Sequence, residues 1–106
     1  MPADNPIFAE IETLLSSGSK TPLDVLEDTL TSGYAAALAL EGERWRLERR
    51  IAEIAARASD ASTRGTTQEL TRLARRLTSA DDELSRLRAI LASLRDRAAA
   101  VRAAAA

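Results

Sequence analysis

Two acidic clusters are the groups in this sequence best suited to chemistry, because carboxylates can hold a metal ion or transfer a proton. Glu41 and Glu43 form one cluster, and Asp81, Asp82 and Glu83 form the other. Neighbouring residues of a helix point in different directions, and the chain has no histidine or cysteine to complete a metal site or act as a nucleophile. We therefore interpret both clusters as solvated surface and expect no enzyme activity, no metal site and no cofactor.

Arginine is the other residue type with binding potential, since guanidinium groups hold phosphate. Residues 1–43 contain eight acids and one base, a net charge of −7, and residues 44–106 contain 14 arginines and eight acids, a net charge of +6. The two parts can neutralise each other, and the arginines of residues 72–102 are interrupted by acids and lack interleaved aromatic residues. Nucleic-acid binding is thus the minority hypothesis. Its candidate phosphate contacts are Arg72, Arg75, Arg86 and Arg102.

The length and composition indicate the domain organisation of the chain that holds these residues. A chain of 106 residues without cysteine fits one small domain with no disulfide framework. No basic segment followed by an apolar one opens the sequence, and no apolar run approaches the roughly 20 residues that span a bilayer. We expect a single α-helical domain, residues 1–106, in the cytoplasm. The abundance of alanine and of arginine over lysine is typical of a GC-rich bacterial coding sequence.

A short helix is predicted over residues 6–17. Asn5 suits the N-cap, Pro6 suits the first turn and Gly18 suits the end. A helix this short needs another element to cover its apolar face. That face consists of Ile7, Ile11, Leu14 and Leu15.

A first long arm is predicted over residues 22–58, where apolar residues recur with heptad spacing. Thr21 and Pro22 provide the start signal, and with Leu23 as position a the pattern continues to Ala58. Gly33 and Arg44 are the two irregular core positions, and we expect them to set register and specificity. Glycine costs about 1 kcal/mol in a helix, yet we favour one continuous helix. Arg44 either reaches out of the seam along its stem, the favoured interpretation, or pairs with a neighbouring glutamate.

A connector, residues 59–66, and a second arm, residues 67–105, complete the pattern. Residues 59–65 are rich in turn formers, and Thr66 with Glu69 forms a capping box. Leucine and alanine then fill an unbroken heptad series from Leu70 to Ala105.

The two heptad segments have equal length, which favours an antiparallel helical hairpin of two coiled-coil arms over one arm of a long parallel dimer. Folding the arms back from Ala58 and Leu70 sets small residues opposite large ones, as interdigitated packing requires. The expected neighbours are Gly33 and Leu94, Ala37 and Leu91, Leu47 and Ala80, and Leu30 and Ala98.

Surplus apolar residues lie off the predicted seam. On the first arm these are Tyr34 at position e and Leu38 and Trp45 at position b, and on the second arm Ile90 lies at position g. One interpretation is that the helix of residues 6–17 covers them within the chain. The other is that they form a homodimer contact in a four-helix bundle, with Trp45 and Tyr34 as anchors.

An alanine-rich hairpin of this length resembles the small secreted hairpin proteins of specialised bacterial export systems. That family is identified by Trp-x-Gly in the turn between its helices. Here the connector reads Ser-Asp-Ala-Ser-Thr-Arg-Gly, and Trp45 lies within the first arm. The sequence is therefore not assigned to that family.

The function expected from these patterns is protein–protein interaction, as a scaffold, adaptor or regulatory module that forms a homo-oligomer, with a dimer favoured and the protein partner unknown. The alternatives are nucleic-acid binding through the second arm and contact with a membrane surface through the helix of residues 6–17. Glu10 and Glu12 disfavour the membrane alternative, because they would face anionic lipid.

Overall fold

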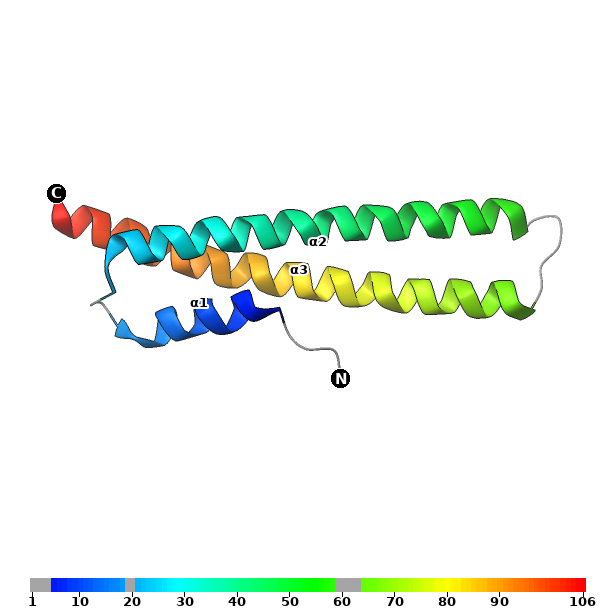
Figure 1. Cartoon of the computed structure of the whole chain (residues 1–106), viewed down its shortest axis with the longest axis horizontal. Helices are drawn as coiled ribbons and strands as arrows, with labels where there is room; N and C mark the ends of the chain where they lie inside the picture. Colours follow the sequence, from blue (N-terminus) through cyan, green and yellow to red (C-terminus); the bar gives the residue numbers. More distant parts are fainter. Residues whose placement is uncertain (1–4, 19–20, 59–63) are drawn as a thin grey trace. The chain divides into compact units, whose positions relative to one another are not determined.

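The computed structural model consists of three helices and describes residues 5–18, 21–58 and 64–106 (Figure 1). Helix α1 spans Pro6–Ser16, α2 spans Leu23–Ala58 and α3 spans Arg64–Ala105. No strand occurs within these described ranges. The predicted all-α class is confirmed.

Helix α1 begins as its sequence predicts. The Asn5 Oδ1 atom accepts a hydrogen bond from the Ile7 amide at 3.3 Å, and Pro6 occupies the first turn. The helix ends at Ser16, one residue before the predicted end. Gly18 then adopts a φ of 78°, a left-handed conformation that glycine adopts without the steric penalty of a Cβ atom.

Helix α2 is one continuous helix through Gly33, which confirms the prediction of an unbroken first arm. It begins at Leu23, one residue later than predicted. Asp24 lies in its first turn, where a carboxylate is favourable beside the unpaired amides, and its Oδ1 atom accepts from the Val25 amide at 3.0 Å.

Helix α3 begins at Arg64, three residues before the predicted start. Thr66 therefore lies inside the first turn, and its prediction as the capping residue is wrong. Glycine weakens a helix without forbidding it, so Gly65 did not mark the boundary. Residues 59–63 of the predicted connector lie outside the described residues.

The packing divides the chain into two compact units. Unit 1 comprises Met1–Leu38 and Ser85–Ala106, and unit 2 comprises Ala39–Leu84. Unit 1 thus contains α1, the first part of α2 and the last part of α3, whereas unit 2 contains the remainder of α2 and α3.

In unit 1 three helical segments share one core. Gly33 of α2 lies beside Leu91 of α3 and Ile11 of α1. The Glu27–Arg102 ion pair, at 2.9 Å, shows that α2 and α3 run antiparallel here. The buried apolar residues are Ile7, Phe8, Ile11, Leu26, Leu30, Ala37, Leu87, Leu91, Leu94 and Ala98.

Gly33 is needed for this close packing. A Cβ atom at this position would overlap the Leu91 side chain and lie 3.5 Å from the Ile11 Cδ1 atom. The sequence pattern predicted Leu94 as the neighbour of Gly33, whereas the nearest side chain is Leu91, about one helical turn away. The predicted pairing considered only the two long arms. It left out α1, whose Ile11 also packs beside Gly33.

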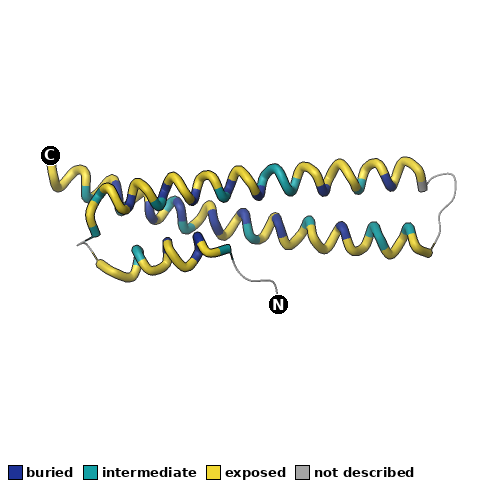
Figure 2. The backbone as a smooth tube through the Cα atoms, in the orientation of Figure 1, coloured by how far each residue is buried: buried dark blue, intermediate teal, exposed yellow. Residues whose placement is uncertain are grey.

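In unit 2 two helical segments pack without a third. One buried cluster contains Leu47, Ile54, Leu73 and Ala80, with Ile51, Leu70 and Leu77 partly buried against it. Leu40 and Leu84 are also buried in this unit, with exposed fractions of 7% and 1%. Ion pairs between Glu43 and Arg76 and between Arg50 and Glu69 show an antiparallel arrangement. In Figure 2 buried residues recur at regular intervals along α2 and α3, as the heptad pattern requires. Antiparallel packing in both units is compatible with the predicted hairpin.

Candidate functional site

Three large apolar side chains of α2 that were predicted as contacts are exposed to solvent. The exposed fractions are 48% for Tyr34, 69% for Leu38 and 58% for Trp45. Tyr34 and Leu38 belong to unit 1, and Trp45 belongs to unit 2. Val25 is also exposed, at 40%. Aromatic and leucine side chains exposed to about this extent are candidates for a contact surface.

The interpretation that α1 covers Tyr34 and Leu38 is wrong. Helix α1 instead buries Ile7, Phe8 and Ile11, with exposed fractions of 5%, 2% and 0%. The Ile11 side chain of α1 packs beside Gly33, where the absence of a Cβ atom leaves room for it. Phe8 was missing from the predicted apolar face of α1, because it directly follows Ile7 and lies outside the spacing of three and four residues that defined that face.

Ile90 differs from the other predicted contact residues. It lies on α3 in unit 1 and is partly buried rather than exposed. The structure therefore leaves Tyr34, Leu38 and Trp45 as the solvated members of the predicted set.

Trp45 lies among charged side chains on the outer side of α2. The Arg49 guanidinium is 5.1 Å from the centre of the indole ring, a cation–π distance, and its Nε atom lies 3.7 Å from the Glu53 carboxylate. Arg46 and Arg50 join these residues around a shallow depression of about 260 Å³. The indole is thus a rigid apolar group framed by polar groups, the usual composition of an interface anchor and its rim.

One edge of the unit 2 seam is closed by ion pairs. Arg76 lies 3.6 Å from Glu43, and Arg50 lies 3.4 Å from Glu69. All four residues occupy position g, which flanks the d positions of the heptad. The d residues Leu47, Ile54, Leu73 and Ala80 are correspondingly buried, with exposed fractions of 4–5%.

The opposite edge of this seam is open. Ile51, Leu70 and Leu77, all at position a, remain only partly buried. The flanking e positions beside them are occupied by Ala55 and Ala74, which are exposed. A methyl group is too short to cover the neighbouring isoleucine and leucines, so apolar surface stays accessible along this edge.

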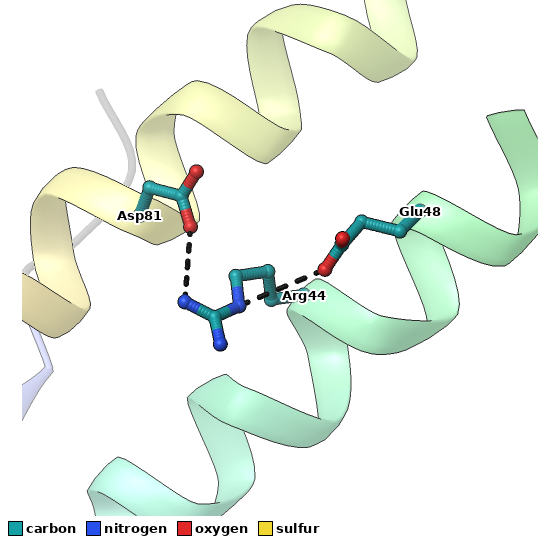
Figure 3. A network of polar contacts seen from close by, with 3 residues as sticks. All are labelled: Arg44, Glu48 and Asp81. Carbon is teal, nitrogen blue, oxygen red and sulfur yellow. Dashed lines mark hydrogen bonds and ion pairs between the residues drawn. The ribbon is translucent and has the colours of Figure 1, made fainter.

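Arg44 lies at the same edge and forms a small polar network, drawn in Figure 3. Its Nε atom is 3.7 Å from the Glu48 Oε1 atom, and its Nη1 atom is 3.5 Å from the Asp81 Oδ1 atom on α3. The side chain is 37% exposed, so the guanidinium reaches the surface as well as pairing. Exposure was the favoured prediction for Arg44, and pairing with Glu41 or Glu48 was the alternative; the structure shows both exposure and a pair with Glu48. Asp81 was missed because only the fold brings it opposite Arg44.

The four arginines predicted as phosphate contacts have different surroundings. Arg86 lies 3.5 Å from Glu12 and stacks over Phe8 at 4.2 Å, and Arg102 pairs with Glu27. These two are engaged within unit 1. Arg72 and Arg75 are exposed and form no ion pair with any residue that the structure describes. The structure does not gather the four into one basic site.

Arg97 has a structural role that sequence reasoning missed. It donates hydrogen bonds to backbone carbonyls at the end of α1. The oxygens of Gly18, Leu15 and Leu14 lie 2.7, 3.0 and 3.5 Å from its guanidinium. A helix leaves its last carbonyls unpaired and carries negative partial charge there, which a guanidinium satisfies. Arg97 occupies heptad position g, and only the fold brings it to the end of α1.

Two further features of the described ranges concern ligands and membranes. No three His, Cys, Asp or Glu residues gather there in a way that suits a metal ion. No helix of the described chain has a stretch both long and apolar enough to cross a bilayer.

The sequence matches no protein-family model, and neither a similar curated protein nor a similar solved structure is found.

Proposed function

We propose that this protein is a non-enzymatic interaction module, a scaffold or adaptor, that forms a homodimer in which helices of two copies assemble into a bundle. The observation that carries this proposal is the exposure of Tyr34, Leu38 and Trp45 on a helix whose other large apolar residues are mostly buried.

The energetic argument favours burial of these side chains against another molecule. Removing the exposed part of a tryptophan from water contributes roughly 3 kcal/mol at the usual value per unit of apolar area. An aromatic side chain also loses little rotational freedom when it is fixed in an interface. Trp45 is already oriented by Arg49, which lowers that cost further.

The open edge of the unit 2 seam supports the same proposal. Ile51, Leu70 and Leu77 lie where a third or fourth helix would complete their burial. In a bundle of two copies, the helices of one copy supply that cover for the other.

The proposal is tested by measuring molecular mass across a range of protein concentrations with light scattering or analytical ultracentrifugation. A dimer is expected, and Trp45→Ala should weaken it while Val25→Ala, a change of another exposed apolar residue, should leave it intact. A mass that stays monomeric at every concentration would overturn the proposal. A dimer that Trp45→Ala leaves unchanged would remove the tryptophan from the contact.

Nucleic-acid binding is a second candidate, favoured by the exposure of Arg72 and Arg75 without ion pairs to described residues. Because Arg86 and Arg102 are held within unit 1, about two phosphates would be neutralised, and the logarithm of affinity should fall with that of salt with a slope of about −2. A mobility-shift assay at low salt checks this, and no shift there would eliminate the candidate.

A further inference from the structure

We infer that two copies dock through one side of unit 2, which we name the Trp45 surface: Trp45, Ile51 and Ala55 of α2 with Leu70, Ala74 and Leu77 of α3. This inference rests on the proposed function and specifies which residues meet. The occupant is the Trp45 surface of a second copy.

Helix geometry places these residues on one side of unit 2. On α2, Ala55 lies four residues from Ile51 and therefore about 40° around the helix. Glu48 lies about 60° and Trp45 about 120° around from Ile51 in the same direction, so Trp45 stands at the outer border of this side. On α3, Ala74 lies about 40° around the helix from Leu70 and about 60° from Leu77, in the same direction from both. A stripe of this width matches the face that a helix buries in a globular core.

The burial of the a positions shows that this side lacks cover. In unit 1 the a residues Leu30, Ala37, Leu91 and Ala98 have exposed fractions of 9%, 7%, 3% and 2%. In unit 2 the a residues Ile51, Leu70 and Leu77 are only partly buried. Leu84, the last residue of unit 2 and also at position a, is by contrast 1% exposed.

The e positions explain the difference in cover between the units. In unit 1 they hold long side chains, including Glu27 and Arg102, which pair across the seam at 2.9 Å. In unit 2, Ala55 and Ala74 leave the stretch of the edge beside Ile51 and Leu70 uncovered. Glu48 and Asp81, also at e positions, pair with Arg44 farther along the same edge. Small flanking residues permit the close approach of another helix. The two alanines therefore leave the seam uncovered and also leave room for a partner helix.

Charge complementarity favours a second copy as the partner. The polar network at the rim of the surface has two carboxylates, Glu48 and Asp81, for one guanidinium, Arg44, at distances of 3.5–3.7 Å. The other rim carries Arg75, which is exposed and forms no ion pair with the described part of the chain. A two-fold interface presents the same patch twice, so the carboxylate surplus of one copy meets Arg75 of the other.

The first test introduces a charge into the Trp45 surface. Ala74→Glu buries an unpaired carboxylate if the surface is an interface, and the dimer Kd should rise by about a hundredfold. Ala39→Glu is the matched control, since Ala39 is also an exposed alanine of unit 2 but lies on the other side of α2. It should change the Kd by less than about twofold. Both changes are at exposed sites, and circular dichroism verifies unchanged helicity.

The outcomes separate the inference from the proposed function. A dimeric parent chain with monomeric Ala74→Glu and dimeric Ala39→Glu supports the Trp45 surface. A dimer that tolerates Ala74→Glu overturns this inference and leaves self-association standing. A parent chain that is monomeric overturns both. Ala55→Glu on the α2 side of the edge should repeat the Ala74→Glu result, which guards against a local effect on α3.

The second test probes the contact between Arg75 and Asp81 of two copies. Arg75→Glu and Asp81→Arg each create like-charge contacts in a symmetric dimer and should each give monomers. Mixed in equal amounts, the two variants regain opposite charges at both contacts, and a mixed dimer should form. Failure of the mixture to dimerise while the parent chain dimerises would show that these two residues do not meet.

Discussion

The two units of this chain bury their seams to different extents, although the same two helices contribute to both. Of the six large side chains that are fully buried, Phe8, Ile11, Leu26, Leu87 and Leu94 belong to unit 1, and Leu84 is the last residue of unit 2. The unit 2 cluster includes three residues that are only partly buried. In unit 1, α1 covers the side of the seam on which Gly33 and Arg97 lie, and long side chains at the e positions flank the a residues on the other side. Unit 2 has no third helix among the described residues, and three of its a residues stay partly exposed.

The third helix of unit 1 is fixed by contacts of two kinds. Apolar side chains of α1 enter the gap at Gly33, and Arg97 satisfies the carbonyls at the end of α1. Unit 2 has no such element among the residues described, and two of its e positions, Ala55 and Ala74, hold alanine where the e positions of unit 1 hold long side chains. We expect stability to be concentrated in unit 1 and association in unit 2.

The largest loss of stability is expected for a truncation in the unit 1 core, compared with the same truncation in unit 2. Ile11→Ala removes a side chain that is 0% exposed, and it should lower the free energy of unfolding by about 3 kcal/mol, through lost burial and a residual cavity. Ile51→Ala, at a partly buried site, should cost about 1 kcal/mol in the monomer. Urea unfolding of both variants measures the difference. Equal losses would contradict the contrast between the units.

A smaller effect is expected from the cap on α1. Arg97→Ala leaves three carbonyl oxygens without their guanidinium and should cost about 1–2 kcal/mol, since hydrogen bonds to a charged donor are stronger than neutral ones but this site is only partly buried. Arg72→Ala, at an exposed arginine, is the control and should change stability by less than about 0.5 kcal/mol. Hydrogen exchange of the α1 amides should rise in the first variant alone, and unchanged exchange would argue against the cap.

Replacing two helical glycines by alanine should change the stability in opposite directions. Gly33→Ala gains about 1 kcal/mol of helix propensity but meets buried Leu91, an overpacking cost of about 1–3 kcal/mol, so net destabilisation is expected. Gly42→Ala meets only the Arg46 guanidinium, at 3.4 Å, and should stabilise by up to about 1 kcal/mol. Thermal unfolding of the pair checks both. Stabilisation by Gly33→Ala would show that the unit 1 core is looser than described.

The smallest expected effect concerns Arg44. Its ion pairs are exposed and contribute little, and Arg44→Leu should raise the melting temperature by a few degrees while relaxing control of register or oligomer number. Calorimetry gives the first quantity and ultracentrifugation the second. An oligomer identical to that of the parent chain would argue against a specificity role for Arg44.

Local signals explain why much of the fold could be predicted. Asn5 and Pro6 mark the start of α1, and heptad spacing predicts the buried residues of α2 and α3. These features depend on neighbours in sequence. The start of α3 at Arg64 was missed because the turn formers before Thr66 are tolerated in a helix.

Tertiary partners were harder to predict. The position of α1 depends on which face of the other helices accepts it, and Ile11 and Arg97 find their partners only when distant segments are brought together. Of the candidate contact residues, Trp45 could be singled out by its place off the seam. The open edge beside it could not, because it results from the combined sizes of side chains on two helices.

The most direct test of the central claim uses the fluorescence of Trp45, the only tryptophan of the chain. Emission is recorded against protein concentration together with the molecular mass. The account predicts that emission moves to shorter wavelength as the dimer forms, since the exposed indole is then buried. A dimer whose tryptophan still emits as a solvent-exposed indole would contradict it.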